Sequence, residues 1–289
     1  MAAKSDRFYR SFLIPKRSGG QREIAAPIPL LLHCQRWILE RVLSRSRIHD
    51  AAHGGVHNRS ALTNARIHAG AAAILKLDIK DFFPSVSTGR GVGVFRRLGY
   101  PANVATTLAL LCFCKGKLPQ GGACSTAIAN SILFRLDSRL SKLGEKLGLS
   151  YTRYVDDLTF SGAYIGVGFQ DIVKEIVISE GFEINEDKTR LMRNASPKFV
   201  TGISLSSGAP RVPRKFRRST RNEAFQILKR GIECHMDHTG RYDPLVLERV
   251  MGRLSYWRMV EPECELAERL LNSIVEYAKS LTSVSEGRV

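Results

Sequence analysis

The sequence lacks several features that would place it in common classes of protein. Its six cysteines include no CxxC pair, and Cys112 and Cys114 lie in an apolar stretch, which favours buried thiols over a zinc site. The longest apolar stretch, near Val104 to Cys114, is too short to cross a bilayer. The polar, basic start from Met1 to Arg10 has no apolar run behind it, which predicts no signal peptide. We therefore expect a protein of the reducing cytoplasm, without a membrane partner.

Acidic residues are scarce. The 289 residues include 27 Asp and Glu against 44 Lys and Arg, a net charge of +17. Because 44% of the residues are hydrophobic, a core can form, and so large an imbalance favours a polyanionic partner over a merely soluble surface. From Thr189 to Arg230 eleven basic residues accompany one acid, Glu223. Apolar residues interleave with them, which indicates a folded basic surface rather than a disordered tail.

The hydrophobic pattern predicts an α+β body followed by a basic helical appendage. There are no internal repeats or low-complexity linkers. We expect the body at 1–205 and the appendage at 206–289. The expected elements are a strand–turn–strand at 10–26, a helix at 29–46, a buried strand at 72–78, helices at 101–113 and 125–147, a hairpin at 151–161, a helix at 169–179, a strand at 199–205, and helices from 213 onward with breaks near 237–241 and at 262.

Three aspartates stand where they could bind divalent cations. Asp156 and Asp157 lie among β-forming residues, a pattern typical of a hairpin tip. Adjacent like charges there are costly unless a cation is bound. Asp78 closes the buried strand on the face opposite its leucines. An isolated acidic pair would be an ordinary polar turn, but carboxylates from two strand ends suit two-metal phosphoryl transfer with oxygen-preferring ions such as Mg²⁺.

Two further segments suit a nucleotide. The loop 118–122 is rich in glycine and leads into a helix near Ser125, and Gln120 can both donate and accept hydrogen bonds. Lys16, Arg17 and Arg22 surround two glycines and could close over a triphosphate. Each segment alone would be an ordinary helix entry or a solvated turn.

Taken in order, these segments resemble reverse transcriptases. Asp78 to Phe83, Leu118-Pro119-Gln120-Gly121 and Tyr154-Val155-Asp156-Asp157 are similar to motifs A, B and C of that family. Segment 14–24 resembles the fingers of bacterial members, and 181–189 resembles motif D. The likeness covers most of the chain, to about Leu205. Asn64-Ala65-Arg66-Ile67-His68 and Val200-Thr201-Gly202 further resemble the bacterial retron subgroup.

The sequence departs from the family pattern at two places. Gly122-Ala123-Cys124-Ser125-Thr126 stands where the family usually has Ala-Pro-Thr-Ser-Pro, and the loss of both prolines predicts a more mobile loop on the template side. Val155 stands where retrons more often carry Ala. Since every acid is present, we interpret this as variation near the primer end.

The resemblance implies a right-hand fold with fingers mainly in 1–70, a palm of antiparallel sheet and helices, and a helical thumb. It implies two Mg²⁺, or alternatively Mn²⁺, held by Asp78 and Asp156 with Asp157 in support. Phe83 would exclude a ribose 2′-hydroxyl, and Phe82 is the expected core member of the pair. Gln120, Lys16 and Arg22 would contact the dNTP. Lys188 is either a proton donor to pyrophosphate or a solvated lysine.

The retron resemblance also implies an RNA surface and a set of partners. Its candidate residues are Asn64, His68, Val200, Thr201, Gly202, Arg211, Arg214, Lys215, Arg217 and Arg218. By residue type alone, His68 is more typical of a packing or capping histidine, and Thr201-Gly202 of a strand bulge. The implied partners are a cognate structured non-coding RNA, its RNA-linked single-stranded DNA product (msDNA) and an accessory effector in phage defence.

Three alternatives stay open. A group II intron-type or abortive-infection reverse transcriptase is one, although a maturase normally carries a long carboxy-terminal X region that an end at residue 289 disfavours. An RNA-directed RNA polymerase would more often carry Gly-Asp-Asp and would not need Phe83. A non-catalytic RNA-binding module on the same fold is disfavoured by the intact acids.

Overall fold

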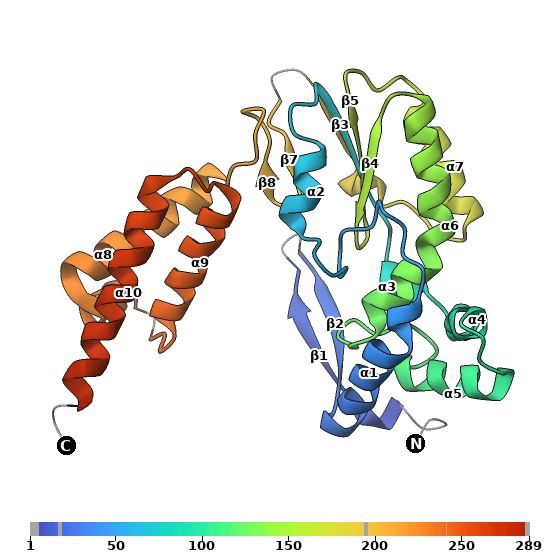
Figure 1. Cartoon of the computed structure of the whole chain (residues 1–289), viewed down its shortest axis with the longest axis horizontal. Coiled ribbons are helices and arrows are strands. Elements are labelled where there is room, and N and C mark those ends of the chain that lie inside the picture. Colours follow the sequence, from blue (N-terminus) through green and yellow to red (C-terminus); the bar gives the residue numbers. More distant parts are fainter. Residues whose placement is uncertain (1–5, 17–18, 194–195, 241, 287–289) are drawn as a thin grey trace. The chain divides into compact units, whose positions relative to one another are not determined.

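The computed structural model describes residues 6–16, 19–193, 196–240 and 242–286 (Figure 1). The chain divides into two compact units, Met1–Thr201 and Gly202–Val289. The first unit is built around an antiparallel sheet, and the second unit is mainly helical. Within the described ranges, no helix combines the length and apolarity needed to cross a membrane.

The central sheet of the first unit has the order β4-β5-β3-β6. Its strands are β3 (Ala73–Asp78), β4 (Ser150–Tyr154), β5 (Asp157–Gly162) and β6 (Arg190–Arg193). The register pairs Leu77 with Leu158 and Asp78 with Asp157. Because side chains alternate along a strand, the leucines face one side of the sheet and the aspartates face the other.

Two long helices bury the apolar side of this sheet (Figure 1). They are α6 (Ser125–Lys146) and α7 (Phe169–Ser179), which supply Leu133, Leu140 and Val173 to a core shared with Phe160 of β5. The other helical segments of the unit are α1 (Pro29–Arg41), η2 (Leu43–Arg45), α2 (Ala61–Ile67), α3 (Phe82–Ser85), α4 (Thr88–Arg97), α5 (Ala102–Cys112) and η3 (Glu186–Lys188).

A separate hairpin lies next to the loop that carries Gln120. Its strands are β1 (Tyr9–Pro15) and β2 (Gln21–Pro27), with Pro15 opposite Gln21. The Ala25 amide donates to the Gln120 carbonyl at 2.9 Å, which joins the hairpin to the loop. Gly121 follows with φ +119°, and a Cβ there would lie 3.0 Å from the Ala25 carbonyl oxygen. This close approach therefore requires glycine. Arg17, one of the predicted phosphate contacts, lies outside the described residues.

The second unit contains α8 (Arg214–Thr239), α9 (Val246–Val260) and α10 (Glu265–Glu286). Its core includes Val250, Leu254 and Trp257. The expected break near 237–241 is present, where Gly240 caps α8 with φ +61°. A further kink within α8 is centred on Gly231, whose φ of +81° is not helical.

Several predicted boundaries need correction. The strand expected at 199–205 is interrupted, since β7 (Phe199–Val200) and β8 (Ile203–Ser204) flank a turn. Thr201 has φ +48° and Gly202 has φ +80°, and two consecutive left-handed residues reverse a chain rather than bulge it. The first helix ends at Arg41 instead of Ser46. The short helix α2 and the strand β6 had no clear pattern in the sequence.

Candidate active site

The three aspartates meet at one end of the central sheet. Asp78 ends β3 and lies opposite Asp157, the first residue of β5. The amide of Ile79 donates to the Asp156 carbonyl at 2.9 Å, which ties the hairpin turn to the end of β3. Asp78 is buried, with 7% of its surface exposed. Asp156 and Asp157, which lie 78 and 79 positions after Asp78 in the sequence, are thus brought next to it by the pairing of β3 and β5.

The carboxylates repel one another in a poorly solvated place. Burial raises the pKa of Asp156 to about 6, and the negative charges of Asp157 and Asp78 add to this shift. Burial also raises the pKa of Asp157, against the opposing effect of Lys76, whose Nζ lies 3.7 Å away. A positive charge placed among the three would therefore be stabilised.

Lys188 supplies one such charge. Its Nζ donates to both carboxylate oxygens of Asp78, at 2.8 and 3.0 Å. Burial alone would lower the pKa of Lys188, but the hydrogen bond to Asp78 and the surrounding acids outweigh it and raise the pKa. Lys188 is therefore a protonated member of the acidic cluster, although 49% of its side chain is exposed to solvent.

The donor set fits a hard divalent cation. Carboxylate oxygens are the ligands that such ions prefer, and the mutual repulsion of these three would be relieved by binding. Among the described residues, no group of three or more His, Cys, Asp or Glu side chains encloses a metal position. An open arrangement suits an ion that takes the rest of its ligands from phosphate and water.

A cavity of about 740 Å³ joins the acids to the residues predicted to bind a nucleotide. Asp78, Asp156 and Lys188 line it from the sheet side. Lys16 and Arg22 line it from the β1–β2 hairpin, together with Gln120. The Gln120 Oε1 atom is buried and has no hydrogen-bond partner within the described part of the chain. A buried acceptor without a partner is costly unless a donor reaches it when a ligand binds.

The two phenylalanines after Asp78 differ in environment. Phe82 is 2% exposed and belongs to the core, as predicted. Phe83 is half-buried, packs against the same core, and has its ring centroid 5.2 Å from that of Phe82. Phe82 and Pro84 are among the residues lining the cavity, and Phe83 is not.

Most of the expected RNA contacts in the first unit are buried. Asn64, His68 and Val200 are each 0% exposed. The His68 ring bonds Thr152 Oγ1 at 2.6 Å and Ser161 Oγ at 2.7 Å, and burial lowers its pKa to about 3. This corrects the expectation that these three side chains touch RNA, because each is enclosed by other parts of the same unit. The packing interpretation of His68 is confirmed.

Thr201 and Gly202 also differ from each other. The Thr201 hydroxyl donates to the Ala61 carbonyl at the start of α2, at 2.9 Å. In this arrangement the hydroxyl hydrogen is not available to donate to RNA. Gly202 is exposed, and a Cβ there would meet open space. Among the candidate RNA contacts Asn64, His68, Val200, Thr201 and Gly202, only Gly202 is exposed.

The basic residues that follow Thr189 include a stripe of arginines on α8. Arg214, Arg217 and Arg218 line a cavity of about 530 Å³ together with Arg221. Their spacing of three, four and seven residues puts them on one helix face, a periodicity that could have singled out Arg221 from the sequence. Lys215 is exposed on the same helix but does not line this cavity. Arg211 is engaged elsewhere, since its guanidinium pairs with the buried Glu261 at 2.8 Å.

Comparison with known proteins gives a consistent family. Residues 14–217 match the family model "Reverse transcriptase (RNA-dependent DNA polymerase)". The Mx162 retron reverse transcriptase of Myxococcus xanthus is 38% identical, over 88% of this chain and 58% of the relative. The Mx65 enzyme of the same species is 36% identical, over 91% and 64%. The Ec83 enzyme of Escherichia coli is 31% identical, over 69% of each chain.

The chain spans about three fifths of the length of the two Myxococcus relatives. The matched region nevertheless contains the three aspartates, the Gln120 loop and the first turn of α8. The α+β architecture agrees with the fold expected for this family. The chain therefore belongs to the reverse transcriptase (RNA-dependent DNA polymerase) family, has its right-hand polymerase fold, and is of the type represented by the retron enzymes.

Proposed function

We propose that this protein is an RNA-directed DNA polymerase of retron type. The observation that carries the proposal is the cavity in which Asp78, Asp156 and Lys188 face Lys16, Arg22 and Gln120. It combines an acidic end suited to cations with basic and amide groups suited to a triphosphate and a base. The proposal extends what the family match shows, because the chain covers only part of its relatives.

In this proposal Asp78 and Asp156 are the principal ligands of two divalent ions, Mg²⁺ or alternatively Mn²⁺, with Asp157 in support. Such ions, when bound, activate the primer 3′-hydroxyl and neutralise the leaving pyrophosphate. Lys16 and Arg22 hold the phosphates of the dNTP, and the free acceptor of Gln120 orients it.

Two further roles are proposed around this centre. Lys188 keeps a proton next to Asp78 and donates it to the departing pyrophosphate. The ring of Phe83 excludes a ribose 2′-hydroxyl from the position of the nucleotide sugar. We assign the fingers mainly to 1–70, the remaining palm to residues up to 205, and the thumb to 206–289. In the thumb, Arg214, Lys215, Arg217 and Arg218 contact phosphates of the template duplex.

The direct test measures incorporation of labelled dNTPs on a primed RNA template with Mg²⁺. Asp78→Asn and Asp156→Asn should abolish synthesis and leave RNA binding intact, because they remove charge without removing volume. Asp50→Asn is a matched control, since the Asp50 side chain is 99% exposed and pairs with Arg59 at the surface. Synthesis at the wild-type rate in either active-site variant would remove the assignment, and RNA binding without synthesis by the wild type would favour a non-catalytic module.

The retron assignment needs its own experiment. Co-expression with the neighbouring non-coding locus should yield a short single-stranded DNA that stays joined to RNA until a debranching enzyme or RNase is added. Robust copying of arbitrary primed templates without RNA-linked DNA would place the protein among general bacterial reverse transcriptases. A role in phage defence with an accessory effector follows from the retron assignment, and loss of phage resistance in the Asp156→Asn strain would test it.

A further inference from the structure

The turn that carries Asp156 has an unusual backbone. Tyr154 pairs with Asp157, so Val155 and Asp156 form a two-residue hairpin loop. Val155 has φ +59°, whereas Asp156 is not among the residues of positive φ. This pattern is that of a type II′ turn, whose first central position strongly favours glycine. A β-branched residue with positive φ is strained, so the surrounding structure must hold it.

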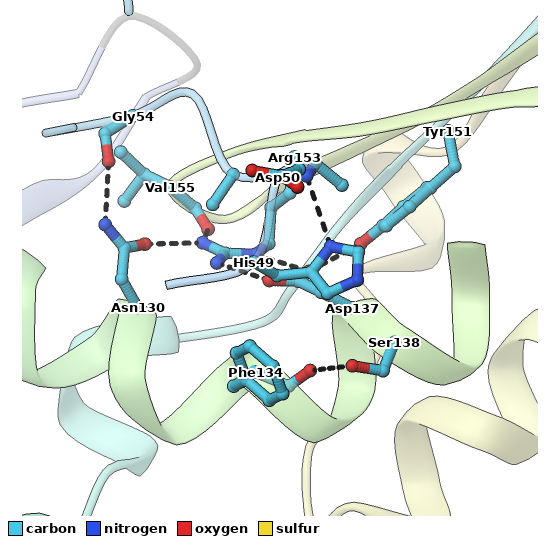
Figure 2. Close-up of polar contacts among 12 residues, drawn as sticks. His49, Asp50, Gly54, Asn130, Phe134, Asp137, Ser138, Tyr151, Arg153 and Val155 are labelled. Atoms are coloured by element: carbon cyan, nitrogen blue, oxygen red, sulfur yellow. Dashed lines mark hydrogen bonds and ion pairs between the residues drawn. The ribbon is translucent and has the colours of Figure 1, made fainter. Parts of the chain in front are cut away.

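Arg153 contacts the strained residue directly. Its Nη1 donates to the Val155 carbonyl oxygen at 2.9 Å and to Asn130 Oδ1 at 2.9 Å. The other edge of the guanidinium is fixed by Asp137 of α6, which accepts from Nε at 2.8 Å and from Nη2 at 2.7 Å. Figure 2 shows Asn130 between the Gly54 carbonyl and the Arg153 guanidinium. The arginine is thereby locked in one orientation, with a hydrogen bond to the turn.

The network lies wholly inside the protein. Arg153 and Asp137 are 0% exposed and Asn130 is 1% exposed, and the Tyr151 hydroxyl donates to Asp137 at 2.8 Å. A buried ion pair is a weak source of stability, because apolar side chains of similar volume usually serve a core as well or better. Its presence beneath the catalytic turn therefore calls for another explanation.

Gly54 confines Val155 from another direction. A Cβ at Gly54 would lie 2.5 Å from Val155 Cγ2 and 2.6 Å from the Val155 nitrogen. The Gly54 carbonyl accepts from Asn130 Nδ2 at 3.0 Å, so the same amide touches both Gly54 and Arg153. The segment that contains Ala51 and Gly54 is also joined to β4, because the Arg153 amide donates to the Ala51 carbonyl at 2.7 Å.

We propose that Arg153, oriented by Asp137 and Asn130, is a positioning residue that holds Val155 at positive φ in the Val155–Asp156 turn and so sets the direction of the Asp156 and Asp157 carboxylates. This inference rests on the proposed polymerase function. Arg153 touches no substrate. It acts by donating a hydrogen bond to the carbonyl of Val155. The backbone of that turn in turn sets the positions of the aspartate side chains.

The test removes the buried ion pair together with the tyrosine hydroxyl that donates to it. The triple variant Tyr151→Phe, Asp137→Leu and Arg153→Met leaves no unpaired charge and keeps a similar volume, so it should fold and bind RNA. Amide hydrogen exchange in the turn, measured without metal, should accelerate about tenfold because the turn opens more readily. The kcat of DNA synthesis should fall roughly 10- to 100-fold because the carboxylates are misplaced, and the KM for dNTP should stay unchanged.

Rescue separates positioning from packing. Adding Val155→Gly to the triple variant should restore much of the kcat, because glycine adopts the left-handed conformation without strain. If the triple variant does not fold, Gly54→Ala presses on Val155 without touching the ion pair, and it should show the same loss of kcat with unchanged KM.

Three outcomes would overturn the inference. These are wild-type kcat and exchange in a folded triple variant, a loss that Val155→Gly does not restore, and wild-type kcat in Gly54→Ala where the triple variant fails to fold. Failure of the proposed function is distinguishable, since the wild type would then be inactive while hydrogen exchange still reports on the turn.

Discussion

At the scale of single residues, the acidic cluster destabilises the folded protein because it places three negative charges close together. Asp78, Asp156 and Asp157 lie close together at the end of β3 and β5, and Lys76 and Lys188 offset part of the repulsion. In the absence of a divalent ion, the folded state therefore contains carboxylates whose charged forms are poorly solvated. This cost is measurable, because it depends on pH.

The first prediction concerns Asp156. Its folded pKa of about 6 lies above the ordinary 3.8, so folding favours the neutral acid. Its contribution to stability is then present below about pH 4 and is lost as pH rises through 6. In EDTA, Asp156→Asn should be more stable than the wild type at pH 7.5 by about 1–3 kcal/mol, with the difference vanishing near pH 4. Urea unfolding between pH 4 and 8 measures this.

The control for this prediction is a divalent ion. Mg²⁺ should stabilise the wild type and leave Asp156→Asn almost unchanged, because binding to the folded state alone raises its stability. A variant that is no more stable than the wild type at pH 7.5 would show that the carboxylate is better solvated than its burial indicates.

The second prediction separates Phe83 from Phe82. Phe83→Val should raise ribonucleotide incorporation relative to deoxynucleotide incorporation, if its ring excludes a 2′-hydroxyl. Phe82→Ala should instead lower the free energy of unfolding by about 3–5 kcal/mol, because it opens a cavity in the core. The two readouts are the rNTP/dNTP ratio and urea unfolding. Since Phe83 is not among the residues lining the cavity, an unchanged ratio would assign it to packing alone.

At the scale of elements, the basic character of the helical unit belongs to one part of one helix. From Arg211 to Arg230 there are eight Lys and Arg and one acid, whereas 231–289 contains seven basic and ten acidic residues. Arg214, Arg217, Arg218 and Arg221 form a stripe on α8, next to the buried Trp257. A single charged helix face is a suitable surface for a phosphate backbone.

The third prediction follows from this stripe. The triple variant Arg214→Ala, Arg217→Ala and Arg218→Ala should weaken RNA binding equally for unrelated sequences and lower the salt slope by about three units. The control changes Arg230, Arg258 and Arg269 to Ala, which removes the same charge from exposed positions outside this cavity. Equal slopes in both variants would show that the stripe is solvated surface.

Arg211 should behave differently from its neighbours. Because it pairs with the buried Glu261, whose other oxygen accepts from the Val212 amide at 2.8 Å, Arg211→Ala should destabilise the helical unit and leave the salt slope nearly unchanged.

At the scale of the whole molecule, two units with separate cores share one chain. The protein has two tryptophans, and each unit contains one of them. Trp37 on α1 is 55% exposed, whereas Trp257 on α9 is 0% exposed. The fluorescence shift on unfolding therefore reports mainly on Trp257 and the helical unit.

The fourth prediction uses this difference. In a Trp37→Phe variant, the urea midpoint from tryptophan fluorescence should lie below the midpoint from far-ultraviolet circular dichroism, which reports on both units. The smaller unit buries a smaller share of its surface and is expected to be less stable. Coincident midpoints would show that the two units unfold as one.

The sequence by itself determined the family, the order of the main elements and the residue types of the candidate site. The aspartates, Gln120, Lys16 and Arg22 could be singled out because each lies in a short segment whose residue types limit its chemistry. The buried strand and the hairpin of β4 and β5 could be predicted because their side-chain alternation is local. The kink at Gly231 and the split of the strand at Thr201 could not, since other residues of these segments continue the regular pattern.

Only the tertiary structure decided which polar residues are buried and what they hold. His68 is enclosed by Thr152 and Ser161, 84 and 93 positions away. Arg211 is neutralised by Glu261, 50 positions away. Arg153 is turned toward Val155 by Asp137 and Asn130 of another element. Burial and hydrogen bonding depend on such distant partners, and a local pattern of residue types carries no information about which partner the fold will bring near.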